Sequence, residues 1–224
     1  MVALSVPAMA KKQNRSIECV LFDWDGTLLD SFQADAEAYS GMFEALGIHW
    51  SMEELKRHYS PNWHRVYRAA GVPRAKWELA DRLWRRCYEN HSPKLQPGAL
   101  GVLRAVARRY TMGLVSSGSR ARVRRQLRKH DVSDMFGAKV CNEDAPRRKP
   151  HPAPLRLALD RLRLPPEVCV YVGDAPEDIE MAHRAGMRGI GVLGGSPVPE
   201  RLRAASPDAM IETIRELPKL LRGW

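Results

Sequence analysis

Short apolar runs alternate with amphipathic helical stretches along the second half of the chain, and this alternation constrains the fold more than any other feature. From residue 97 onward, apolar runs occupy 110–115, 138–141, 168–172 and 189–193, with helical patterns at 98–109, 120–130, 154–163 and 177–185. Strands and helices that alternate in this way form right-handed βαβ units and a parallel sheet. With a first run at 18–22 and a last strand–helix unit at 209–221, the sequence predicts an α/β protein with a doubly wound sheet of about five strands.

Residues 32 to 96 break this rhythm, because they contain helical patterns and no strand-like run. Helices are expected at 32–46, 51–59, 63–70 and 75–90, separated by breaks that contain glycine or proline. An all-helical insertion after the first strand indicates a separate small domain placed over the sheet. We therefore predict a flexible N-terminal tail at 1–17, a discontinuous core formed by 18–31 and 97–224, and an inserted helical domain at 32–96.

Composition bounds the class of protein and its location. The chain is 44% hydrophobic and 28% charged, as in ordinary soluble globular proteins, and no apolar run approaches the roughly 20 residues that a membrane-spanning helix needs. The N-terminal MVALSVPAMAKK has no basic region before its short apolar stretch, so we do not expect a signal peptide. The four cysteines form no C-x-x-C pair, which predicts buried free thiols in a reducing, cytoplasmic compartment.

The net charge of +10 raises the question of an anionic partner. In the densest basic run, 120–129, Val123 and Leu127 keep i, i+4 spacing, which predicts an amphipathic helix with a charged, solvated outer face. Steering of an anionic substrate is the alternative interpretation. Because no nucleic-acid-binding motif or interleaved aromatic stripe accompanies the charge, no nucleic-acid partner is expected. A basic nucleic-acid-binding or scaffolding protein without turnover stays open as a different class of function.

Chemically reactive side chains follow the ends of the predicted strands. The carboxyl ends of parallel strands meet at one edge of the sheet, where ligands of such sheets bind. Carboxylate oxygens are the ligands that Mg²⁺ prefers, and a hydroxyl, a lysine and free backbone N–H groups suit an anion. The sequence therefore predicts a magnesium and anion site at this edge, formed by Asp23, Asp25, Ser116, Lys149, Asp174 and Asp178.

The order of these residues resembles the four motifs of the haloacid dehalogenase superfamily. The stretch 23–27 (DWDGT) resembles the D-x-D-G-T motif, Ser116 the hydroxyl of the second motif, Lys149-Pro150 the third, and 173–178 (GDAPED) the fourth, G-D-x-x-x-D. A helical insertion between the first two motifs is typical of the branch that is similar to phosphoglycolate phosphatase and β-phosphoglucomutase. The resemblance implies a Rossmann-like catalytic core beneath an α-helical cap domain.

The resemblance also implies a role for each motif residue. Asp23 would be the nucleophile that forms an aspartyl phosphate, and Asp25 the general acid and base. Mg²⁺ would be held by Asp23, the Asp25 backbone carbonyl and Asp174, with Asp178 orienting the metal's outer ligands or Lys149. The transferring oxygens would be bound by Ser116, the Ser117 N–H and Lys149. Substrate contacts in the cap are expected at the helix break formed by Asn62, Trp63, His64 and Arg65.

These roles predict a Mg²⁺-dependent phosphatase of a small phosphorylated metabolite, acting as a monomer or small homo-oligomer away from membranes. A phosphosugar mutase of the β-phosphoglucomutase type is the alternative, because it would differ in cap residues and share the core. A phosphonatase would need a cap lysine as a Schiff base, and Lys56 and Lys76 carry no supporting pattern. A dehalogenase is disfavoured by Asp25, because dehalogenases of the superfamily lack the second aspartate of the first motif.

Overall fold

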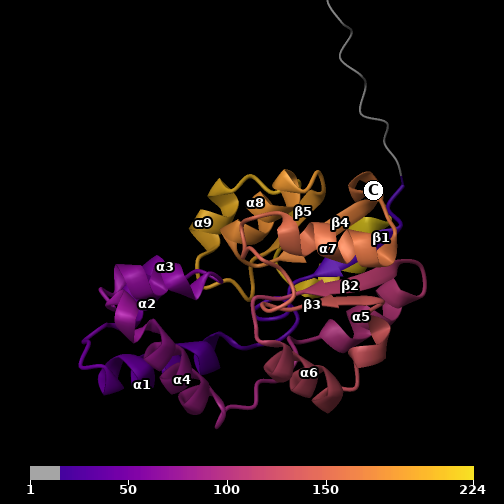
Figure 1. Ribbon diagram of the computed structural model, residues 1–224. Helices are drawn as coiled ribbons and strands as arrows, with labels where there is room; N and C mark the ends of the chain where they lie inside the picture. Colours follow the sequence, from indigo (N-terminus) through magenta and orange to yellow (C-terminus); the bar gives the residue numbers. More distant parts are fainter. Residues whose placement is uncertain (1–15) are drawn as a thin grey trace, which may run out of the picture.

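The computed structural model describes residues 16–224 and shows a parallel sheet with helices on both faces and further helices inserted to one side (Figure 1). Most of the predicted tail at 1–17 lies outside the described residues. The predicted α/β, Rossmann-like architecture is confirmed. The six strands are β1 (Cys19–Phe22), β2 (Thr111–Val115), β3 (Ala138–Val140), β4 (Cys169–Gly173), β5 (Arg188–Val192) and β6 (Ala209–Ile211).

The order of the strands determines where the reactive edge lies, which is the side of the sheet formed by the carboxyl ends of its strands. All neighbours pair in parallel in the order β3-β2-β1-β4-β5-β6, so the chain runs outward from β1 on one side and then crosses to the other. A ligand crevice forms at such a switch point, beyond the carboxyl end of the central strand. The sheet has six strands where about five were expected, and its outermost strand, β6, begins the strand–helix unit predicted at 209–221.

Alternate residues of β1 enter two separate apolar layers. Val20 and Phe22 pack with α5 (Ala99–Ala107), α6 (Arg120–Lys129) and α10 (Leu217–Leu221), whereas Cys19 and Leu21 pack with α7 (Ala153–Leu162) and α8 (Pro176–Arg184). Burial on both faces explains why β1 is an unbroken apolar run. The helix α9 (Pro199–Ala204) was not predicted, because its six residues are too few for a clear periodic pattern.

Four helices occupy the stretch between β1 and α5, as predicted for residues 32–96. They are α1 (Phe32–Ala45), α2 (Met52–His58), α3 (Trp63–Ala69) and α4 (Trp77–Tyr88), the last preceded by a short 3₁₀ turn at Arg74–Lys76. They share an apolar cluster of their own, which contains Met42, Phe43, Val66 and Tyr67. The proposed division of the chain into domains at 31/32 and 96/97 remains a prediction. Among residues 16–224, no helix is long and apolar enough to cross a membrane.

Polar contacts attach the inserted helices to the sheet side of the molecule. Glu177 of α8 is 1% exposed, and its Oε1 accepts hydrogen bonds from Ser60 Oγ at 2.7 Å and from Arg65 at 3.1 Å. Arg201 of α9 donates to the Tyr59 carbonyl at 2.9 Å. The loop between α2 and α3 is therefore held against α8 and α9, directly beside the reactive edge.

Candidate active site

The turn after β1 brings the first motif against the fourth. Gly26 has φ of +80°, a left-handed conformation that glycine adopts without strain. A Cβ at this position would collide with the Asp174 carboxylate. Thr27 Oγ1 donates a hydrogen bond to Asp174 Oδ1 at 2.7 Å. The glycine and the threonine of the D-x-D-G-T motif therefore allow Asp174, which is distant in sequence and follows β4, to contact the turn after β1.

Three buried carboxylates and one buried ammonium meet at this edge. Oxygen atoms of Asp23, Asp174 and Asp178 lie within 4.8 Å of one another. The Lys149 Nζ lies 2.8 Å from an oxygen of Asp23 and 2.8 Å from an oxygen of Asp178. Each of these four residues is at most 4% exposed. The predicted strand-end residues of the first, third and fourth motifs are thus in direct contact.

The ionisation of the cluster reflects burial and crowding of like charges. Burial raises the pKa of Asp23 to about 7, although the Lys149 ammonium opposes the shift. Burial and the neighbouring carboxylates of Asp23 and Asp178 raise the pKa of Asp174 well above its usual range. Burial alone would lower the pKa of Lys149, but its two carboxylate partners outweigh burial and raise it. One lysine does not neutralise three carboxylates, so the cluster has the charge and the oxygen donors that suit a hard divalent cation.

The loop after β2 supplies hydroxyl and backbone groups next to the cluster. Ser116 Oγ accepts a hydrogen bond from the Gly118 N–H at 2.9 Å and lies 3.4 Å from Asp25 Oδ2. Ser119 caps α6, because its side chain accepts a hydrogen bond from the Arg122 N–H. Ser116 thus reaches the first motif, while the N-cap role belongs to Ser119.

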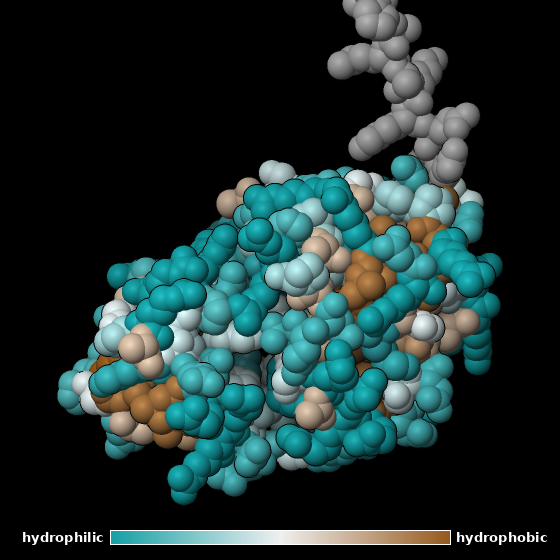
Figure 2. All heavy atoms as spheres, viewed as in Figure 1, coloured by the Kyte–Doolittle hydropathy of each residue, from teal (hydrophilic) through white to brown (hydrophobic). Residues whose placement is uncertain are grey.

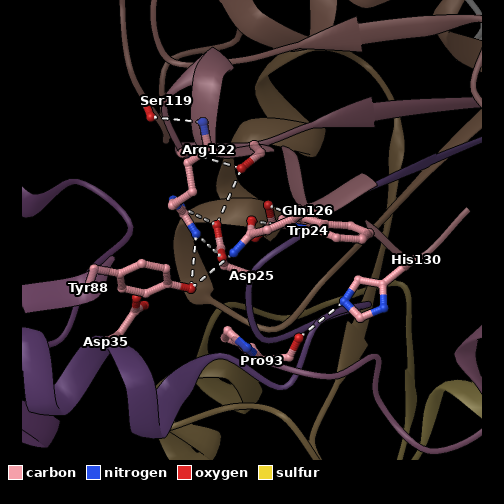
Figure 3. A network of polar contacts seen from close by, with 12 residues as sticks. Trp24, Asp25, Asp35, Tyr88, Pro93, Ser119, Arg122, Gln126 and His130 are labelled. Atoms are coloured by element: carbon pink, nitrogen blue, oxygen red, sulfur yellow. Dashed lines mark hydrogen bonds and ion pairs between the residues drawn. The ribbon is translucent and has the colours of Figure 1, made fainter. Parts of the chain in front are cut away.

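The Asp25 carboxylate is held by an arginine that the sequence analysis did not single out. Arg122 of α6 donates to both Asp25 oxygens, at 2.6 Å and 2.7 Å (Figure 3). Its guanidinium lies over the ring of Tyr88 from α4, 4.9 Å from the centroid, and contacts the Tyr88 hydroxyl at 3.3 Å. Trp24 is fully buried and donates to Gln126, which also bonds Tyr88. A single network therefore joins the first motif, α6 and the inserted helices.

Arg122 is an exception in the run 120–129, whose residues Arg124, Arg125, Arg128 and Lys129 form the exposed face that the sequence predicts. Its side chain is only 11% exposed, although several of its neighbours in α6 are exposed. Buried Val123 and Leu127 place one stripe of the helix in the core, as predicted. Arg122 borders that stripe and turns toward Asp25. The only sign in the sequence that Arg122 faces inward is its place directly before the buried Val123. This place does not distinguish Arg122 from the other arginines in the helix.

The four cap residues chosen from sequence have different surroundings. Trp63 lines the cavity between the inserted helices and the sheet edge. His64 contacts the Arg148 guanidinium at 2.9 Å, and Arg65 pairs with Glu177. The side-chain oxygen of Asn62 is buried without a hydrogen-bond partner among the described residues. A role in substrate specificity stays a proposal for all four.

Asp35 of α1 is a buried carboxyl group that the motifs do not include. Its Oδ2 accepts a hydrogen bond from the Tyr59 hydroxyl at 2.9 Å, and it lines the same cavity as Asp23. Burial, with the negative charge of Asp25 nearby, raises the pKa of Asp35 to about 7. Because the folded pKa lies above the ordinary 3.8, ionised Asp35 disfavours the folded state.

Asp35→Asn is expected to change how stability depends on pH. The wild-type protein loses folding free energy from this group as pH rises from about 4 through about 7, whereas asparagine loses none. The variant should therefore gain on the wild type by on the order of 1–3 kcal/mol between about pH 5 and about pH 8. Urea denaturation of both proteins across this range measures the gain, with exposed Asp30→Asn as the matched control. Parallel curves for Asp35→Asn and wild type would contradict the assignment.

Fold and site together define an α/β protein with an acidic cluster at the switch point of its sheet and helices inserted after its first strand. The sequence model of the haloacid dehalogenase-like hydrolases matches residues 20–192, and the chain belongs to this family. Its relatives include a phosphoglycolate phosphatase from Salmonella paratyphi A, 28% identical over 93% of both chains. They also include a pyrophosphatase PpaX from Oceanobacillus iheyensis, 26% identical over 90% of this chain and 95% of the other.

Solved structures of the same fold agree with this assignment. A haloacid dehalogenase-like hydrolase from Bacteroides fragilis superposes with a TM-score of 0.82 at 27% identity, over 90% of this chain and all of the other. CbbY from Rhodobacter sphaeroides, solved with xylulose-(1,5)bisphosphate, has a TM-score of 0.77 at 23% identity, over 90% of this chain and 96% of its own. The second likeness concerns the fold alone.

Proposed function

We propose that this phosphatase is a Mg²⁺-dependent phosphomonoester hydrolase that acts on a small phosphorylated metabolite through an aspartyl-phosphate intermediate at Asp23. The observation that carries the proposal is the grouping of Asp23, Asp174 and Asp178 at the switch point of the sheet, with Lys149 in contact with Asp23 and Asp178. The phosphatase names of relatives across nearly the whole chain support it.

The proposed reaction begins at Asp23. One carboxylate oxygen attacks phosphorus, the bond between phosphorus and the ester oxygen breaks, and the phosphoryl group becomes attached to Asp23. The Trp24 N–H donates to Asp23 Oδ1 at 2.7 Å and Lys149 contacts the same oxygen, so the other oxygen is the one free to attack. Covalent catalysis divides a difficult displacement into two easier steps.

Asp25 moves the protons in this scheme. It gives a proton to the departing alkoxide and later takes one from the water that cleaves the aspartyl phosphate, which regenerates Asp23. General acid–base assistance of this kind contributes roughly 10²–10⁴-fold to the rate. Both Asp25 oxygens contact Arg122, so Asp25 must loosen this ion pair before it can donate a proton.

The residues present fit a magnesium ion. Asp23 and Asp174 would hold it together with the Asp25 carbonyl, while Asp178 positions Lys149 through their ion pair. The ion, when bound, offsets the repulsion between an anionic nucleophile and an anionic phosphoryl group. Lys149, Ser116 and the Ser117 N–H would bind the oxygens of the phosphoryl group that is transferred.

The remaining parts of the proposal concern the setting of the enzyme. The four cysteines are free, which supports a cytoplasmic location. We propose a monomer or small homo-oligomer without a nucleic-acid partner, because the strongest basic run is a helix that packs on the sheet and joins the site through Arg122.

Release of inorganic phosphate should require added Mg²⁺ across a panel of phosphomonoesters and pyrophosphate. Treatment with excess chelator should abolish release, because the acidic cluster then repels the substrate, and added Mg²⁺ should restore it. A phosphate-release assay on sugar phosphates, phosphoglycolate, nucleotides and pyrophosphate measures this. Full activity in excess chelator would contradict the metal assignment, and transfer of the phosphoryl group to a sugar in place of water would identify a mutase.

A further inference from the structure

The cavity above the acidic cluster is large, and both aromatic and charged side chains line it. It has a volume of about 450 Å³, and Asp23, Asp25 and Asp174 lie at its sheet end. This volume falls within the roughly 300–1,000 Å³ of pockets that enclose whole small molecules. The inserted helices and their loops contribute six aromatic side chains to its walls: Tyr39, Tyr59, Trp63, Tyr67, Trp84 and Tyr88.

The inserted helices contact the sheet side of the molecule, so the volume of the cavity reflects a site between packed layers. Ser60 and Arg65 bond the buried Glu177, and Arg201 bonds the Tyr59 carbonyl, so the helices are docked against the sheet side. The cavity therefore lies between two layers that contact each other and is not a gap left by their separation. Phosphoglycolate and pyrophosphate have only a few atoms beyond one phosphate, and either would leave most of the aromatic wall without a contact.

Polar atoms without partners accompany the aromatic wall. The Oδ1 of Asp35 and the indole N–H groups of Trp63 and Trp84 are buried and have no hydrogen-bond partner among residues 16–224. All three residues line the cavity. Buried polar groups in native proteins are nearly always paired, with protein, water or ligand. One carboxylate acceptor and two N–H donors beside aromatic faces suit a planar ring whose edge offers both donors and acceptors.

We propose that the leaving alcohol of the substrate carries a planar, hydrogen-bonding heterocycle, as in a nucleoside monophosphate. The phosphate lies at Asp23, the ring packs against the aromatic wall at Trp84, and Asp35 accepts a hydrogen bond from the ring edge. Tyr88 is buried between Trp84, which it stacks on with centroids 4.7 Å apart, and the Arg122 guanidinium, so it supports Trp84 from behind. This inference rests on the phosphatase function proposed above and names its substrate class.

The first test compares substrates that differ only in the ring. The kcat/KM for the four common ribonucleoside 5′-monophosphates should exceed that for ribose 5-phosphate by roughly 10- to 100-fold, the range that base–aromatic stacking supplies. Phosphoglycolate and pyrophosphate should be poorer than any nucleotide. Equal or better turnover of ribose 5-phosphate, a sugar bisphosphate, phosphoglycolate or pyrophosphate would overturn the proposal.

A matched pair of variants locates the selectivity. Trp84→Leu should lower the ratio of nucleotide to ribose 5-phosphate kcat/KM by about tenfold, because the stacking surface is lost. Trp50→Leu is the control, since Trp50 packs against Phe43 and His58 in the same helical layer outside the cavity. It should leave the ratio unchanged. A ratio that falls equally in both variants would assign the effect to general loosening and contradict the proposal.

Binding separates this inference from the phosphatase proposal. Calorimetric titration of the Asp23→Asn variant with a nucleoside monophosphate and with ribose 5-phosphate, both with Mg²⁺, needs no turnover. Tighter binding of the nucleotide by at least tenfold supports the ring site even if no phosphoester is hydrolysed by the wild type. Equal binding, together with Mg²⁺-dependent hydrolysis by the wild type, would leave the phosphatase proposal standing and overturn the ring site.

Discussion

Asp23→Asn should reduce phosphate release by about 10⁴-fold or more while leaving the protein folded. The amide cannot attack phosphorus, and loss of a nucleophile from a group of residues that act together costs rates of this order. The fold should hold, because the amide removes one buried negative charge and Lys149 keeps its 2.8 Å contact with Asp178. Single-turnover phosphate release and thermal melting of the same preparation measure the two quantities.

Asp30→Asn is the matched control for this variant. Asp30 lies seven residues along the same segment and is exposed, so its amide should leave both activity and melting unchanged. Activity of Asp23→Asn close to that of the wild type would rule out Asp23 as the nucleophile. A strong loss of activity accompanied by an unfolded protein would leave the Asp23→Glu variant, which retains the charge, to decide the role.

Lys149→Met should have the largest effect on stability. Removing the only buried ammonium among Asp23, Asp174 and Asp178 leaves carboxylates crowded within 4.8 Å of one another without compensation. Breaking a buried ion pair in this way costs about 3–5 kcal/mol, or roughly 10 °C in melting temperature for a chain of this size. Activity should fall as well, because the transferring oxygens lose a cation.

Magnesium and pH distinguish this electrostatic effect from a loss of packing. Mg²⁺ should raise the melting temperature of Lys149→Met more than that of the wild type, since the ion supplies the missing positive charge. The deficit should also shrink as pH falls and the carboxylates become protonated. Lys94→Met, at an exposed position, should show neither response. A deficit that is independent of both Mg²⁺ and pH would indicate lost packing and contradict the assignment.

The sheet and the four motif positions were accessible from sequence, because both are written in local patterns. Apolar runs such as 168–172 identify strands, and polar residues directly after them identify the reactive edge. Parallel topology then requires residues as distant as Asp23 and Asp174 to meet. The short helix α9 was missed, since its six residues are too few for a period to be visible, whereas β6 falls in the strand–helix unit predicted at 209–221.

The partners of the motif residues were not accessible in the same way. Arg122 pairs with Asp25 across 97 positions, and nothing in an arginine-rich helix marks which arginine faces inward. Glu177 lies inside the fourth motif at a variable position, yet it is buried and bonds Ser60 from the inserted helices. Such pairs depend on how two layers dock, which is decided by tertiary packing and leaves no periodic trace in the sequence.

The central position of β1 has a practical consequence for handling the protein. The strand β1 begins at Cys19, beside Thr111 and Cys169, which are the first residues of the neighbouring strands. Asp23 follows the other end of β1, where the carboxyl ends of the strands lie. A fusion partner or surface tether joined ahead of Ile17 is therefore attached on the side of the sheet opposite to Asp23 and the cavity above it. Preparations immobilised in this way should keep the cavity accessible to substrates in solution during screening.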